Sequence, residues 1–322
     1  MQQEIQKKMF YTPQNGFVLG LMGVLTPIVA TLIIALLMVF IAFGAGEGFE
    51  KLFDSPVFVY ITQVLCEGAF VLALFIFNKK TNTNFVSAGQ LKTKPKYLNW
   101  VVAIVVGIAM PLLLNPIISL WEQLLALMGI KISGLNIPFS TGLDLALAIL
   151  MLGLLPAFCE EMLFRGGVLN GLRDKGVWFA VLYSAMCFAL MHGNLQQLPY
   201  TFILGLVIGY VVYYTRSVWL GVLIHACNNT TVLVAGFLAG SGEASALTGA
   251  DIIYVVLMTL VGVALIVGTM VFTKKYNQPK TVANPMLATP PQTTTKNDSF
   301  ALTMTLVTVL AGIAIILINI FN

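Results

Sequence analysis

Charged residues are scarce in this chain. Asp, Glu, Lys and Arg make up 9% of its 322 residues, whereas hydrophobic residues make up 58%. A soluble domain carries about 25% charged residues, so the composition excludes an ordinary soluble fold. The net charge is only +4, and the lysines stand between apolar runs, which indicates a role in membrane orientation and no nucleic-acid partner. The composition predicts a protein embedded in the lipid bilayer.

Cysteine is also rare, and an internal repeat is lacking. The four cysteines are Cys66, Cys159, Cys187 and Cys227. They lie in apolar segments without Cys-x-x-Cys spacing, which excludes a disulfide framework and a cysteine-based zinc cluster and predicts buried free thiols. The missing repeat weakens the hypothesis of a transporter built from inverted repeats.

Apolar runs of membrane-spanning length are what the chain has in abundance. Nine runs follow one another, at 17–44, 56–78, 98–128, 143–164, 176–193, 198–214, 217–239, 251–273 and 300–321. The first run is too long for the apolar part of a signal peptide, so we expect it to be retained. Continuous runs without strict alternation indicate helices, so the expected fold class is an all-α polytopic membrane protein.

The polar connections predict the orientation and division of the chain. Positive charge concentrates in every second connection, which predicts a cytoplasmic N-terminus and an extracytoplasmic C-terminus. We expect a plasma membrane, and the simple chain suggests a bacterial one. Residues 274–299 have the polar, Pro- and Thr-rich composition of a linker. We therefore divide the chain into an eight-helix core at 1–273, this linker, and a ninth membrane helix at 300–322 that forms an appendage.

Charge interrupts the fourth run at Glu160, Glu161 and Arg165. A carboxylate inside a bilayer is costly unless it is paired or hydrated, and is therefore a functional candidate. On a helix, Glu161 and Arg165 stand at positions i and i+4 and can form an ion pair. Glu160 points about 100° away and stays available for chemistry. The alternative is that the three charges end a helix near the lipid headgroups.

The two histidines of the chain, His192 and His225, lie in or at the edge of apolar runs. A single intramembrane histidine is usually a hydrogen-bonded packing residue. His225 shares a helix face with Asn229, however, and both histidines accompany the charged group. We therefore predict a polar cavity built from the fourth, fifth and seventh helices. Straight helices would place Glu160 and His192 at different depths, so this cavity requires a tilted, broken or displaced helix.

These motifs resemble the three-motif signature of a known family. Glu160-Glu161-x-x-x-Arg165, Phe188-x-x-x-His192 and His225-x-x-x-Asn229 are similar to the motifs of the CPBP intramembrane proteases. That family groups type II CAAX prenyl endopeptidases with bacterial proteins linked to bacteriocin processing and self-immunity. The resemblance covers residues 98–240 in detail, and nothing carries over to the ninth helix.

The resemblance implies a CAAX-protease-like core of eight helices and a role for each motif residue. Glu160 would be the general base that activates water, with Glu161 and Arg165 as a supporting pair. His192, His225 and Asn229 would position that water and stabilise the oxyanion. Peptide hydrolysis requires such a base and such hydrogen-bond donors.

Three alternatives stay open. Glu160, His192 and His225 are a sufficient ligand set for a catalytic zinc ion, but the chain has no His-Glu-x-x-His helix, so we favour hydrolysis without a certain cofactor. The predicted substrate is a peptide or a membrane-associated protein. The chain could instead be a non-catalytic membrane partner, such as a bacteriocin self-immunity factor or a regulator of a membrane signalling protein. A proton-coupled transporter is the third alternative. The sequence indicates no oligomeric state.

Overall fold

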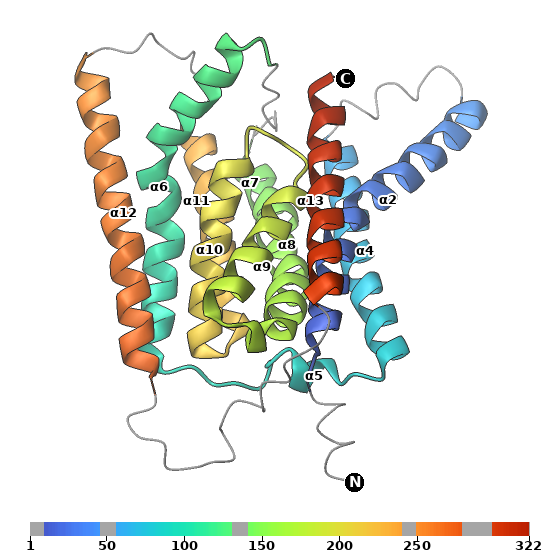
Figure 1. The fold of residues 1–322 in the computed structure, drawn as a ribbon. Helices are drawn as coiled ribbons and strands as arrows, with labels where there is room; N and C mark the ends of the chain where they lie inside the picture. The colour runs from blue at the N-terminus through green and yellow to red at the C-terminus, as the bar shows by residue number, and fades with distance from the viewer. Residues whose placement is uncertain (1–9, 46–55, 131–140, 240–248, 279–297, 322) are drawn as a thin grey trace.

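The computed structural model describes residues 10–45, 56–130, 141–239, 249–278 and 298–321, and every regular element in these ranges is a helix (Figure 1). The long helices are α2 (Pro13–Ala45), α4 (Pro56–Thr81), α6 (Tyr97–Leu127), α10 (Leu198–Thr215), α11 (Val218–Ala239), α12 (Gly249–Asn277) and α13 (Asp298–Phe321). A fourth span consists of α7 (Gly142–Ala148), η2 (Ile149–Leu154), α8 (Leu155–Glu161) and η3 (Met162–Leu169). The short helices are α5 (Phe85–Ala88), η4 (Arg173–Lys175) and α9 (Val177–Met191).

Eight helices within the described ranges are long and apolar enough to cross a membrane. The predicted all-α polytopic membrane fold is therefore confirmed. The run predicted at 176–193 differs, because it forms α9, which has only 15 residues where a bilayer requires about 20. Neighbouring helices, among them α2, α10 and α13, pack against α9. These contacts bury most of the residues of α9.

Successive spans run in alternate directions, so α2 begins and α13 ends at opposite ends of the bundle (Figure 1). Which end faces the cytoplasm stays a prediction. The linker predicted at 274–299 overlaps the last turn of α12, and its residues 279–297 lie outside the described ranges.

The C-terminal helix α13 packs against α2 and α9. The hydroxyl of Thr308 lies 3.2 Å from the hydroxyl of Tyr183 on α9. Asn319 Nδ2 donates to the carbonyl oxygen of Gly193, just after α9, at 2.7 Å. This helix therefore contacts the turn that contains His192. The division of the chain into core, linker and appended helix stays a prediction.

The fourth span is an interrupted helix. Two π-helical segments, η2 and η3, flank the α-helical α8. A π-helical turn is wider than an α-helical turn and occurs frequently at functional sites. Pro156 stands in the first turn of α8, at the position of the bend that a proline predicts. Helix α6 also contains two prolines, Pro111 and Pro116, and continues through them as one helix.

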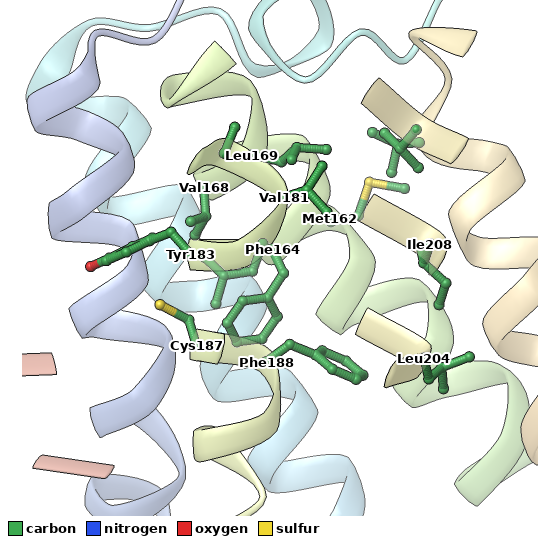
Figure 2. Close-up of a cluster of buried hydrophobic side chains, with 14 of the residues drawn as sticks. Met162, Phe164, Val168, Leu169, Val181, Tyr183, Cys187, Phe188, Leu204 and Ile208 are labelled. Atoms are coloured by element: carbon green, nitrogen blue, oxygen red, sulfur yellow. The ribbon is translucent and has the colours of Figure 1, made fainter. Parts of the chain in front are cut away.

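The centre of the bundle is formed by η3, α9 and α10 (Figure 2). Phe164 and Phe188 are fully buried, and their rings meet edge to face with centroids 5.6 Å apart. Helices α9 and α10 approach closely at Gly205, where an added Cβ would lie 3.0 Å from the Cα atom of Ala185. Gly205-x-x-x-Gly209 thus forms the close helix contact that its spacing predicts.

A second close approach holds α11, the helix that carries His225, against α6. A Cβ added to Gly107 would lie 2.6 Å from the Cβ of Cys227 and 2.7 Å from the carbonyl oxygen of Ile224. We expect Gly107→Ala to lower the free energy of unfolding by about 1–3 kcal/mol, because the two backbones must separate. Thermal unfolding followed by tryptophan fluorescence measures this loss.

The matched control for this substitution is Gly236→Ala on α11, where nothing lies within 4 Å of an added Cβ. Alanine stabilises a helix relative to glycine, so this variant should unfold at the wild-type temperature or above it. Equal unfolding temperatures for the two variants would contradict the close contact.

Candidate active site

Glu161 and Arg165 form the predicted ion pair. Arg165 Nη1 lies 2.7 Å from Glu161 Oε1, and both side chains are fully buried. Arg165 Nη2 donates to the carbonyl oxygen of Gly205 at 3.0 Å, and its Cζ lies 4.5 Å from the ring centroid of Phe188. The positive charge is therefore compensated inside the protein. The helical span continues past the three charges to Leu169, so these charges do not mark its end.

His225 joins this pair from α11. Its Nδ1 lies 3.1 Å from Glu161 Oε1, the oxygen that also accepts from Arg165. A carboxylate oxygen can only accept, so Nδ1 carries a proton, and the neutral imidazole has Nε2 as its acceptor atom. Glu161 thus fixes the orientation of His225, as a third group orients a catalytic base.

His192 is oriented by the backbone. It directly follows α9, and its Nδ1 lies 2.8 Å from the carbonyl oxygen of Phe188. A carbonyl also only accepts, so Nδ1 again carries the proton and Nε2 is the acceptor. The ring of Phe188 contacts both imidazoles, with centroid distances of 5.1 Å to His192 and 5.5 Å to His225. Both histidines are therefore held in a defined orientation and tautomer.

A cavity of about 420 Å³ lies among α4, α6, α8, α10 and α11. Glu160, His192, His225 and Asn229 all line this cavity, as the motif spacing predicts, whereas Glu161 and Arg165 contact the site from the protein interior. The walls supplied by α4, α6 and α10 were not predicted. The other polar lining residues are Gln63, Asn115, Glu122, Gln196, Gln197, Tyr200, Thr201 and Asn228.

Two asparagines of α11 form a hydrogen-bonded chain at the cavity wall. The hydroxyl of Tyr200 donates to Asn228 Oδ1. Asn228 Nδ2 then donates to Asn229 Oδ1 at 3.1 Å, and Asn229 Nδ2 donates to the carbonyl oxygen of Leu152 in η2 at 3.3 Å. The chain links α10, α11 and the fourth span. Sequence reasoning selected Asn229 and missed Asn228 and Tyr200, because helix periodicity alone does not reveal a partner on another helix.

Straight helices of the predicted lengths would place Glu160 and His192 at different depths in the membrane. The observed lengths of the fourth span and of α9 reduce this difference. The fourth span continues to Leu169 instead of ending at 164, so Glu160 lies about 14 Å from its end at 1.5 Å per residue. Helix α9 is only about 21 Å long by the same measure. Both side chains therefore reach one cavity.

Glu160 is 5% exposed, and its Oε2 has no hydrogen-bond partner among the described residues. The carboxyl group of Glu67 on α4 is close enough to act on it electrostatically. Sequence reasoning missed Glu67, although a lone carboxylate in the apolar run at 56–78 is the kind of residue that marks a site within a membrane.

The zinc alternative stays a hypothesis. In the part of the chain that the structure describes, no group of three or more His, Cys, Asp and Glu side chains is arranged to hold a metal ion. All four cysteines are free, with Cys159 and Cys187 buried as predicted and the other two half-buried.

Comparison with protein families places the site in a known context. Residues 142–231 match the family model for type II CAAX prenyl endopeptidase Rce1-like proteins. The matched segment contains all six predicted site residues, and it does not contain Glu67. Neither the search of curated proteins nor the search of solved structures gave a match.

Proposed function

We propose that this protein is an intramembrane endopeptidase in which Glu160 activates the attacking water. The match of residues 142–231 to the type II CAAX prenyl endopeptidase Rce1-like family model, in a multi-pass membrane protein, supports the proposal. The observation that carries the proposal is the buried Glu160 oxygen that has no hydrogen-bond partner among the described residues, in one cavity with His192 and His225. A general base must lie within reach of the water whose proton it takes.

The proposed reaction is a direct hydrolysis. The Glu160 carboxylate takes a proton from water while the water oxygen attacks the carbonyl carbon of the peptide bond. The π electrons of the carbonyl group move to its oxygen and give a tetrahedral oxyanion. Glu160 then delivers the proton to the amide nitrogen, the C–N bond breaks, and a carboxyl group and an amine leave.

The histidines and the asparagine have different roles in this scheme. Nε2 of His192 accepts a hydrogen bond from the second O–H of the attacking water, which keeps this proton, and so orients the water. When His225 carries a second proton, its Nε2–H donates to the oxyanion, with the charge balanced by Glu161 at Nδ1. The N–H of Asn229 that does not bind Leu152 is a further donor to the oxyanion.

The proposed substrate is a peptide or a segment of a membrane-associated protein. The cavity volume of about 420 Å³ falls within the range of about 300–1,000 Å³ that is usual for ligand sites. Its wall also contains apolar side chains, namely Val59, Ile118, Leu152, Leu204, Val232 and Leu233. This mixed lining suits an apolar peptide segment with a polarised carbonyl group.

An isotope experiment tests the proposal. The protein in liposomes is incubated with a pool of apolar peptides in water labelled with heavy oxygen, and the products are analysed by mass spectrometry. We expect new C-termini that each carry one labelled oxygen, and cleavage that survives chelation of divalent metals. His192→Phe should slow cleavage by about 10²–10³-fold, the cost of removing one well-placed polar partner.

Two results would contradict this function. Cleavage that chelation abolishes and zinc restores would overturn the metal-independent mechanism. A folded protein that cleaves no peptide of the pool would favour the non-catalytic membrane partner.

A further inference from the structure

Glu122 is a carboxylate of the cavity wall that the proposed reaction does not use. It stands on α6 and lies outside the segment that matches the protease family. Gln196 Nε2 donates to Glu122 Oε1 at 2.6 Å. Glu122 Oε2 accepts no hydrogen bond from the described residues and, unlike Glu160 Oε2, is not fully buried. One oxygen of Glu122 is thus held in place, and the other is accessible.

The position of Glu122 is fixed by contacts between α6 and the turn after His192. Trp121 Nε1 donates to the carbonyl oxygen of Leu195 at 3.1 Å, beside the bond from Gln196 to Glu122. The end of α6 is therefore joined to this turn by two hydrogen bonds. The donor to Glu122 is a neutral amide, so it orients the carboxylate without compensating its charge.

The lining of the cavity carries negative charge without positive charge. Glu122 and Glu160 are its acids, and none of the described residues that line it is a lysine or an arginine. The charge of Arg165, in the protein interior, is compensated by Glu161. The described residues form no ion pair with Glu122. A carboxylate that is partly removed from water attracts a cation strongly, because protein and lipid screen its charge weakly.

A structural role alone does not require an acid at this position. Gln196 Nε2 needs only an acceptor, and the amide oxygen of a glutamine would serve as well as a carboxylate. A negative charge within a membrane span is costly unless it is balanced or hydrated. Among the described residues no cation balances it, so the charge is available to a ligand of the opposite sign.

Glu122 is the last of a row of cavity-lining residues on α6. Pro111, Asn115, Ile118 and Glu122 follow one another at intervals of three or four residues and all line the cavity, as residues on one helix face do. The helix ends at Leu127, so Glu122 is the member of the row nearest to this end. A Lys or Arg side chain can lay its apolar stem along Ile118 and keep its charged end at Glu122.

We propose that Glu122 determines substrate specificity by forming an ion pair with a positively charged group of the substrate. This inference rests on the proposed function, because it names the class of peptide that the same cavity cleaves. The substrate is then an apolar segment with one cation. That cation is the charged end of a Lys or Arg side chain or a free N-terminal ammonium group.

The test compares peptides that differ in one charge. Two N-acetylated peptides share an apolar sequence and carry either lysine or norleucine at one position, which is varied along the sequence. A third peptide has norleucine and a free N-terminus, which reports on the ammonium group. The protein is in liposomes of phosphatidylcholine, which has no net charge to attract the cation. We expect one of the two cationic peptides to have a kcat/KM about 10- to 100-fold higher than the neutral peptide, the contribution of a hydrogen bond to a charged group.

Variants assign this preference to Glu122. In Glu122→Gln the ratio of the kcat/KM values should fall close to one, because the amide still accepts from Gln196 but does not balance a cation. Glu122→Lys should prefer a peptide with glutamate to the peptide with lysine. Asp174→Asn, which removes a carboxylate outside the cavity, should keep the wild-type ratio. A purely structural role of Glu122 would change the cleavage of all peptides by the same factor and leave the ratio unchanged.

The outcomes separate this inference from the proposed function. Cleavage of all peptides at equal rates by the wild-type protein, or a preference that Glu122→Gln retains, would overturn the inference while the function stands. If the protein cleaves none of them, the function fails, and binding of the same peptides with a fluorescent label tests Glu122 alone. Tighter binding of a cationic peptide that disappears in Glu122→Gln supports the ion pair, and equal binding overturns it.

Discussion

Replacing Glu160 with glutamine is expected to slow peptide hydrolysis by about 10²–10⁴-fold, which is what general acid–base catalysis contributes. Glutamine has nearly the same shape as glutamate, but its amide does not take a proton from water. Glu160 takes part in neither of the ion pairs that the described residues form at the site, so the substitution breaks no ion pair. We therefore expect kcat to fall without a loss of stability.

The measurement is the initial cleavage rate on one peptide, combined with the unfolding temperature of the same preparation. Asp174→Asn is the matched control, because it removes a carboxylate from η4, which does not line the cavity. Its rate should equal that of the wild type. A Glu160→Gln protein that cleaves at the wild-type rate would overturn the assignment of the base.

The helix boundaries show what hydropathy can and cannot predict. The run predicted at 56–78 becomes a helix at Pro56–Thr81, whose last turn also contains Lys79 and Lys80, and the run at 217–239 becomes Val218–Ala239. The fourth run was predicted to end at 164, yet the helix continues to Leu169. Hydropathy counts Glu161 and Arg165 as two charges, whereas the fold neutralises them in one ion pair.

The candidate site was predictable where its residues follow a helical repeat. The spacing of Glu161 and Arg165 predicts their contact, and the spacing of His225 and Asn229 predicts a common wall. Glu67, Asn228 and Tyr200 could not be assigned in this way. Their partners lie on other helices, as for Tyr200 and Asn228, whose hydrogen bond joins α10 to α11. Such contacts depend on tertiary packing, for which a single sequence gives no spacing rule.

Replacing Arg165 with methionine is expected to lower the free energy of unfolding by about 3–5 kcal/mol, the cost of leaving one partner of a buried ion pair uncompensated. Methionine fills much of the space against Phe188 but donates to neither Glu161 nor the carbonyl oxygen of Gly205. The Glu161 carboxylate would keep only its contact with His225. Denaturant unfolding in mixed micelles, followed by tryptophan fluorescence, measures the change.

The double variant Glu161→Gln/Arg165→Met separates the charge from the packing. It removes the uncompensated carboxylate together with the guanidinium, so it should recover a large part of the stability that Arg165→Met loses, because replacing a whole buried pair costs far less than breaking it. It should not recover the cleavage rate, because His225 then lacks the carboxylate that orients its Nδ1. A double variant whose loss of stability equals the sum of the two single losses would contradict a buried ion pair. A double variant with wild-type activity would show that the pair does not support the catalytic histidine.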